Sequence, residues 1–373
     1  MKRILASLIM VAMMLIAIAA PALADVTTDV TVSSGGGEIP IVKCKWEQEP
    51  NTVNSTLETG DPTHAINGTQ VNPPLVKCAV KPISYYAVVT DEEDGGSVSQ
   101  VYADVWHPDD SPAPYSTGDD PRGPYFKYEI AFSKLGHTAT ERALLTTAYD
   151  AGLVTFGVGY NLTEAIFEME KGTADLWMGE EVIDYEQPAG DYKVEVFAVD
   201  HQNNQSAVVT NYFEYVAICG IEIDFTSISY GPVNLGIEKM VAGDTNWAAP
   251  AAPAGAGQSN LATVRNIGNT WASVVICQDD MGFGKTGTGD EATWNVMFDA
   301  RMGNDDTYYE QYAPEEEVTL LNALGLSSKD ELDFSIKVIK GFGTHSGTMT
   351  LGCFTRDFGY DAEAIVGILD PCW

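Results

Sequence analysis

The chain has 373 residues and a formal net charge of −33, with 53 acidic side chains against 20 basic ones. A negative field of this size repels nucleic acids and anionic membranes, so neither is an expected partner. The content of 45% hydrophobic residues excludes a disordered chain, and the length favours two domains.

The first 24 residues have the pattern of a secretory signal peptide. Lys2 and Arg3 precede an apolar run, and a small-x-small triplet ends at Ala24. We therefore expect cleavage after Ala24 and a secreted protein, either extracellular or at the cell surface. No second long apolar run follows, so no membrane span is expected in the mature protein.

The segment directly after this cleavage site has the alternation of a β-strand. Residues 25–32 alternate valine and threonine with polar side chains, and three glycines follow at 35–37. A lone strand ahead of flexible glycines cannot form a sheet by itself. It must pair with a sheet edge, either in its own chain or in another subunit by self-association. The remainder of 25–82 is rich in turn residues and is expected to be irregular and tied by a disulfide.

Residues 83–216 are expected to form an Ig-like antiparallel β-sandwich. Alternating stretches between Gly, Pro and Asp turns predict strands at 83–90, 98–106, 125–132, 191–200 and 207–216. A helical insertion lies between the third and fourth of these strands. Capping patterns predict one helix between Thr138 and Gly152 and a second between Asn161 and Gly172.

Residues 217–373 are expected to form a second β-sandwich domain. Strand patterns lie at 221–230, 261–265, 271–278, 293–300, 333–340 and 347–354. Pro314 and the three glutamates after it predict a short helix that closes near Gly325. The expected fold class is therefore mainly β, with two antiparallel Ig-like β-sandwich domains of which the first carries the helical insertion.

Two tracts of the second domain resemble a known secreted β-sandwich pattern. In ISYGPVNLG at 228–236 a strand ends in an aromatic-Gly turn, and in TVRNIGN at 263–269 a strand runs into an Asn-x-Gly-Asn turn. This pattern resembles Ig-like domains of archaeal and bacterial surface proteins and, more distantly, camelysin-type matrix-fibre proteins. In the first domain, DYKVEVFAVD at 191–200 resembles the penultimate strand of many Ig-like modules. Camelysin-type proteins have sometimes been assigned protease activity, but no protease motif is present here to carry it over.

An even number of cysteines in an oxidising compartment predicts three disulfides. The six residues are Cys44, Cys78, Cys219, Cys277, Cys353 and Cys372. From their positions along the chain we favour the pairs Cys44–Cys78, Cys277–Cys353 and Cys219–Cys372.

Four sequons make this protein a candidate glycoprotein. They lie at Asn54, Asn67, Asn161 and Asn204. If Asn161 caps a helix, its side chain is occupied, so glycosylation is favoured at Asn54 and Asn204 instead.

Calcium is the favoured ligand of the acidic turns, although no cofactor is required. Carboxylates at one end of the first sandwich would supply hard oxygen ligands. The candidates are Asp91, Asp94, Asp109, Asp119 and Asp200. The alternative is that these turns are simply solvated.

Two tryptophans are candidates for ligand contact. Trp46 and Trp247 lie in polar or Pro/Ala-rich surroundings, unlike the tryptophans in strand patterns. Exposed tryptophans would suit glycan or peptide ligands.

The sequence contains no recognisable catalytic motif. The run Gly282–Thr286 lacks the first glycine of a phosphate-binding loop, because Asp279 stands there. The histidines lack zinc-binding spacing, and His345 beside Ser346 is not a nucleophile–base arrangement. We therefore predict that the protein is not an enzyme but a structural protein of the cell surface or extracellular matrix, self-assembling as a filament through its N-terminal strand. The alternatives are a carbohydrate- or peptide-binding adhesion module and, less favoured, a secreted hydrolase.

Overall fold

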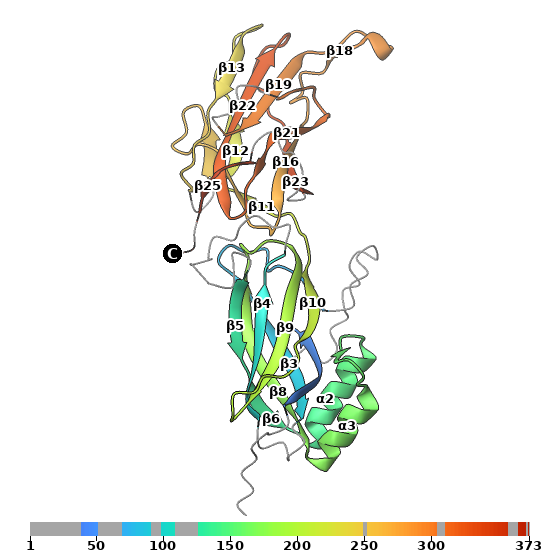
Figure 1. Ribbon diagram of the computed structural model, residues 1–373. Helices are drawn as coiled ribbons and strands as arrows, with labels where there is room; N and C mark the ends of the chain where they lie inside the picture. Colours follow the sequence, from blue (N-terminus) through green and yellow to red (C-terminus); the bar gives the residue numbers. More distant parts are fainter. Residues whose placement is uncertain are drawn as a thin grey trace, which may run out of the picture. The chain divides into compact units, whose positions relative to one another are not determined.

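The computed structural model describes residues 39–50, 69–90, 98–108, 126–248, 252–303, 310–356, 365–370 and 372. These residues are mainly β and form largely antiparallel sheets that pack as two Ig-like sandwiches, which confirms the expected fold class (Figure 1). The signal peptide at 1–24 and the strand expected at 25–32 lie outside the described residues.

One sheet of the first sandwich has its strands in the order β6-β8-β3-β1-β7, and all neighbours are antiparallel. The strands are β1 (Ile41–Gln48), β3 (Val80–Thr90), β6 (Ser133–Gly136), β7 (Thr155–Phe156) and β8 (Ala174–Asp184). The regular strand β1 corrects the expectation that 25–82 is irregular up to the first domain. The strand also carries three buried charged side chains, those of Lys43, Lys45 and Glu47.

The facing sheet has its strands in the order β2-β10-β9-β4-β5. They are β2 (Gln70–Val71), β4 (Val98–Trp106), β5 (Phe126–Ala131), β9 (Gly190–Asp200) and β10 (Val209–Tyr215). The pair β2–β10 is parallel and the others are antiparallel. Buried side chains such as Tyr85, Val194 and Phe213 fill the space between the two sheets.

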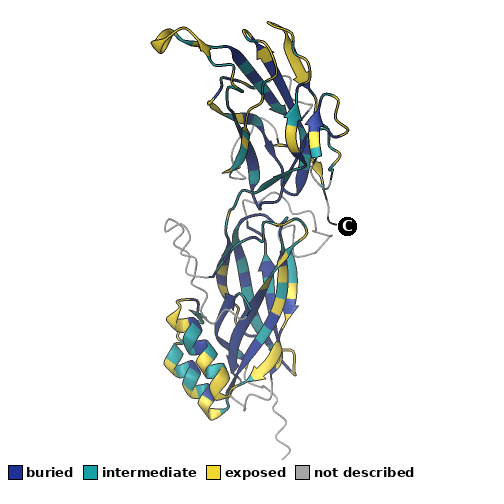
Figure 2. Cartoon of the chain, turned by 180° about the vertical axis from the view of Figure 1, so that it is seen from behind, coloured by how far each residue is buried: buried dark blue, intermediate teal, exposed yellow. Residues whose placement is uncertain are grey.

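Two helices cover the outer face of the first sheet (Figure 1). They are α2 (Ala139–Asp150), capped by Thr138, and α3 (Leu162–Lys171), which is capped by Asn161 and closed by a left-handed Gly172. Both predicted helices are confirmed. They could be predicted because the residues that start and end them lie close together in the sequence. The strand β1 is therefore buried on both of its faces, whereas the outer sides of the helices are exposed (Figure 2).

The second sandwich contains the remaining strands. The larger sheet has β11 (Ile221–Ile223), β13 (Glu238–Val241), β15 (Thr263–Asn266), β19 (Val296–Met302), β20 (Glu310–Tyr312), β22 (Ser328–Val338) and β25 (Ile368–Leu369). The facing sheet has β16 (Trp271–Gln278), β21 (Glu317–Leu324), β23 (Met349–Arg356) and β24 (Ile365–Val366). Two small ribbons pair β12 (Phe225–Ser229) with β14 (Ala252–Gly255) and β17 (Lys285–Thr286) with β18 (Thr293–Trp294), the latter around the 3₁₀ turn η1 (Gly289–Glu291).

The prediction of a helix after Pro314 is wrong, because the chain forms a strand there. Glu315 adopts a left-handed turn with φ of 65°, and the chain then runs as β21 antiparallel to β16. The buried Leu320 and Leu324 pack into the second core. Tertiary pairing therefore outweighs the local helix signal at this position.

Candidate functional site

The disulfides differ from the expected pairs. Cys78 is bonded to Cys372 and Cys219 to Cys353, whereas Cys44 and Cys277 are free. Each of the three pairs Cys44–Cys78, Cys277–Cys353 and Cys219–Cys372 is therefore wrong. Cys44 points into the core between β1 and the two helices, and burial raises the pKa of its thiol to about 12, so it stays protonated.

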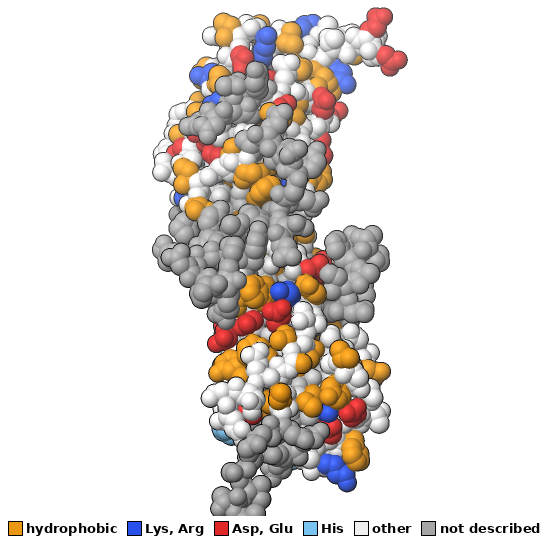
Figure 3. Space-filling view, in the orientation of Figure 1, with side chains coloured by type: hydrophobic (Ala, Val, Ile, Leu, Met, Phe, Trp, Pro, Cys, Tyr) orange, Lys and Arg blue, Asp and Glu red, His pale blue; other side chains and the backbone are white. Residues whose placement is uncertain are grey.

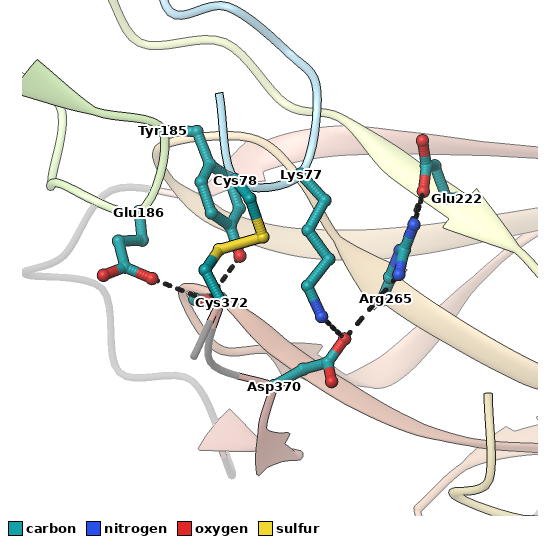
Figure 4. The surroundings of a disulfide bond; sticks show 9 residues. Lys77, Cys78, Tyr185, Glu186, Glu222, Arg265, Asp370 and Cys372 are labelled. Atoms are coloured by element: carbon teal, nitrogen blue, oxygen red, sulfur yellow. Dashed lines mark hydrogen bonds and ion pairs between the residues drawn. A yellow bond between two sulfur atoms is a disulfide. The ribbon is translucent and has the colours of Figure 1, made fainter. Parts of the chain in front are cut away.

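The disulfide between Cys78 and Cys372 joins residues that lie 294 positions apart and ties the first sandwich to the last segment of the chain (Figure 4). Beside it, the Asp370 carboxylate contacts Lys77, lies 3.1 Å from Lys329 Nζ and lies 3.8 Å from the Arg265 guanidinium. Partial burial opposes ionisation of Asp370, but hydrogen bonds from the two lysines outweigh it and lower the pKa. The disulfide and the ion pairs of Asp370 together link the first sandwich to the end of the chain, and we call them the C-terminal tie.

Polar contacts between the β8–β9 turn and Ser327 support the C-terminal tie. The hydroxyl oxygens of Tyr185 and Ser327 lie 2.6 Å apart, and Ser327 donates to the Glu186 carboxylate at 3.2 Å (Figure 4). Both partners of Ser327 belong to the first sandwich, while Ser327 itself belongs to the second. The disulfide is therefore embedded in a set of polar contacts rather than isolated.

The two tryptophans proposed as ligand contacts differ in exposure. Trp46 has an exposed fraction of 0%, stacks on Tyr86 with ring centroids 4.9 Å apart and donates through Nε1 to Gln48. The prediction that Trp46 is a ligand contact is therefore wrong. Trp247 is half-buried, with the Arg265 guanidinium 3.8 Å from its ring centroid. Its role as a ligand contact stays a prediction.

Only one of the five calcium candidates lies in the described part of the chain. Asp200 accepts hydrogen bonds from the backbone N–H groups of Gln202 and Asn204 and from the Asn204 side chain, at 2.7 to 2.8 Å. Its carboxylate therefore closes the turn after β9. Asp91, Asp94, Asp109 and Asp119 lie outside the described residues, within which no group of three or more metal-binding side chains occurs. Calcium binding stays a prediction.

The sequons are likewise untested as modification sites. Asn54 and Asn67 lie outside the described residues. The Asn161 side chain accepts the Glu164 backbone N–H at 3.1 Å, as its capping role requires. Asn204 is half-buried beside Asp200.

The edge of β10 opposite β9 is the candidate interaction site. Every residue of β10 pairs with β9 on one edge, whereas on the other edge β2 covers only Glu214 and Tyr215. The Glu214 N–H donates to the Thr69 carbonyl at 2.9 Å, which fixes the direction of its backbone away from β9. Because backbone direction alternates along a strand, Thr210 and Tyr212 point to the same edge. No other described strand pairs with them there.

The side chains around this edge would not form a large apolar docking surface. On the face drawn in Figure 3, hydrophobic side chains occur as small groups among polar and acidic ones. Tyr212 is 40% exposed and Val208 is 46% exposed. The backbone that no described strand covers is therefore the more specific feature of this site.

A buried histidine is a feature that sequence reasoning missed. His107 has an exposed fraction of 1%, and neither ring nitrogen has a hydrogen-bond partner among the described residues. Its ring lies 5.5 Å from that of Tyr192. Burial, together with the nearby Lys127 charge, lowers the pKa of His107 to about 3.

This histidine should make the protein sensitive to acid. The unfolded chain takes up the His107 proton near pH ~6.5, whereas the folded chain stays neutral there until about pH 3. The unfolded state binds more protons in this window, so the free energy of unfolding falls as pH drops. We expect His107→Phe to reduce the loss between pH 7 and pH 5 by about 1–3 kcal/mol, measured by urea unfolding. The exposed His201, changed to Gln, is the control, and equal pH slopes in all three proteins would contradict the assignment.

The comparisons with known proteins find no family. No protein-family model matches the chain, and no protein with curated annotation matches its sequence. The resemblance to camelysin-type proteins therefore gains no support. Within the described residues, no helix has the length and apolar character needed to cross a membrane.

Several solved structures share a distant likeness. One is the CsuC–CsuE chaperone–tip adhesion subunit pre-assembly complex from archaic chaperone–usher Csu pili of Acinetobacter baumannii, at 10% identity and a TM-score of 0.23, covering 76% of this chain and 96% of that one. Another is the C-terminal domain of the Streptococcus pyogenes antigen I/II-family protein AspA, at 12% identity and a TM-score of 0.21, covering 84% and 96%. The C-terminal domain of the Streptococcus agalactiae polypeptide BspA matches at 12% identity and a TM-score of 0.20, covering 85% and 96%. Scores this low leave the function to be argued from the chain's own residues.

Proposed function

We propose that this chain is a secreted, non-enzymatic structural protein of the cell surface or extracellular matrix that assembles by strand addition. The donor is the N-terminal segment 25–32 of one subunit, and the acceptor is the open edge of β10 in the next. The observation that carries the proposal is that, within the described part of the chain, no strand pairs with the outward-facing backbone of Thr210 and Tyr212, whereas the other edge of β10 is fully paired with β9. Such an edge takes up an extended segment through main-chain hydrogen bonds.

The features of the rest of the chain support the same proposal. Two disulfides are typical of a protein that matures in an oxidising compartment. The competing adhesion hypothesis loses one of its two candidate contacts, because Trp46 is buried. Calcium in the acidic turns would be compatible with assembly and remains part of the proposal.

The acceptor edge can be tested by removing one N–H group. Tyr212→Pro deletes the donor that faces the open edge and leaves Asn211 and Phe213 to pair with β9, since proline is tolerated at strand edges. We expect Tyr212→Pro and deletion of 25–32 each to reduce assembly at least tenfold, measured by light scattering and electron microscopy. Tyr212→Val keeps the N–H and should assemble like the wild type.

The same variants separate the proposal from pairing within one chain. If residues 25–32 complete a sheet in their own subunit, their deletion will lower the melting temperature of the monomer. Tyr212→Pro will then leave the extent of assembly unchanged. Assembly that survives both the deletion and Tyr212→Pro would overturn the proposal.

A further inference from the structure

Three polar side chains occupy interior positions of the first sandwich. Lys45 and Glu47 on β1 have exposed fractions of 0% and 1%, and Asn211 on β10 has one of 6%. Asn211 takes a core position in the alternation of β10, between the buried Val209 and Phe213. An ionised pair in such a place costs several kcal/mol of desolvation that its mutual attraction need not repay, so its presence requires a reason.

The three side chains meet at one carboxyl group. Lys45 Nζ lies 2.8 Å from Glu47 Oε1, as an ion pair, while Asn211 donates through Nδ2 to Glu47 Oε2 at 2.6 Å. Lys45 Nζ also donates to the Val194 carbonyl at 2.9 Å. Val194 is the residue on β9 that pairs directly with Asn211. The Lys45 amine therefore lies next to the strand pair that Val194 and Asn211 form, and it contacts the same carboxyl group as the Asn211 amide.

We propose that Lys45 and Asn211 join in an intramolecular amide bond, with Glu47 as the catalytic residue. The bond would link the strand β1 to the strand β10 inside the first sandwich. This inference does not depend on strand addition and stands apart from the proposed function.

The reaction balances without an oxidant or a cofactor. The Lys45 ammonium first gives a proton to Glu47, which leaves a neutral amine. Nζ then attacks Asn211 Cγ, a new C–N bond forms, and Glu47 relays a second proton from Nζ to Nδ2. The bond between Cγ and Nδ2 breaks, and ammonia leaves. The products are an amide, a neutral Glu47 carboxylic acid and one ammonia, so no charge stays buried.

The surroundings favour each part of this chemistry. Burial lowers the pKa of Lys45, although the Glu47 carboxylate opposes this effect, so a neutral amine is more accessible than in water. The Asn211 carbonyl oxygen is buried and has no hydrogen-bond partner among the described residues. Packing holds the three groups together, which replaces an encounter in solution by a prearranged contact.

Peptide mapping of the full-length, disulfide-reduced protein by mass spectrometry tests the proposal. We expect the peptide that contains Lys45 to be joined to the one that contains Asn211, with a combined mass lower by one ammonia, about 17 Da. Trypsin should not cleave after Lys45. Separate peptides of unchanged mass, with cleavage after Lys45, would overturn the proposal, and this wild-type result needs no variant.

Matched variants assign the role of Glu47. Glu47→Gln keeps the size of the side chain but cannot relay the protons, so the cross-link should be lost. Lys43→Arg changes a lysine of the same strand whose Nζ instead pairs with Glu168 at 2.8 Å, and this variant should keep the cross-link. A cross-link that persists in Glu47→Gln would exclude Glu47 as the catalytic residue.

Discussion

Replacing Trp46 with alanine should lower the free energy of unfolding by about 3–5 kcal/mol, the range for deletion of a large aromatic side chain from a core. Trp46 stacks on Tyr86 between β1 and the helices, within a cluster that includes Leu145, Met169 and Leu176. Denaturant unfolding followed by circular dichroism gives the measurement.

Trp247 is the matched control for this prediction. It is half-buried and contacts Arg265 through its ring face, an interaction worth about 0.5–1 kcal/mol at exposed sites. We therefore expect Trp247→Ala to have a small effect on stability. Equal losses in the two variants would show that Trp46 is not the core residue described here.

Removing the disulfide between Cys78 and Cys372 should have the next largest effect. The bond closes a separation of 294 residues, and loss of a native disulfide typically costs about 2–5 kcal/mol. The double variant Cys78→Ala and Cys372→Ala should also loosen the end of the chain after β25, because only the pairing of β25 with β22 and the contacts of Asp370 with Lys77, Lys329 and Arg265 then hold this segment. Calorimetry and limited proteolysis at the C-terminus measure the two effects.

The other disulfide provides a control of different location. Cys219 and Cys353 both belong to the second sandwich, so their replacement should destabilise that sandwich without freeing the C-terminus. Thiol labelling after denaturation checks the pairing itself, because Cys44 and Cys277 are the free cysteines. If Cys78→Ala alone does not expose an additional thiol at Cys372, the pairing is wrong.

Much of the fold follows from patterns that are local in the sequence. The strand at 98–106 was predicted from its alternation and agrees with β4. The helix starts at Thr138 and Asn161 were predicted from capping residues, and both side chains accept a backbone N–H as expected. These features depend on residues two to three positions apart, which a single sequence displays directly.

The candidate site could be predicted only in part. The alternation of 25–32 indicates a strand that must pair with a sheet edge, but nothing in the sequence identifies β10 as an edge. That property depends on β2 covering only the last two residues of β10. A strand edge is a relation between elements far apart in the chain, so no local pattern reports it.

The sequence by itself determined the mainly β fold class, the helical insertion and the excess of acid that disfavours nucleic acids, since each depends on composition or short spacing. Only the tertiary structure decided that Cys78 meets Cys372, that Trp46 belongs to a core, and that Lys45, Glu47 and Asn211 share one buried site. The physical reason is that burial and pairing depend on which distant strands pack together. The identity of a polar residue does not tell whether it lies inside a sandwich or on its surface.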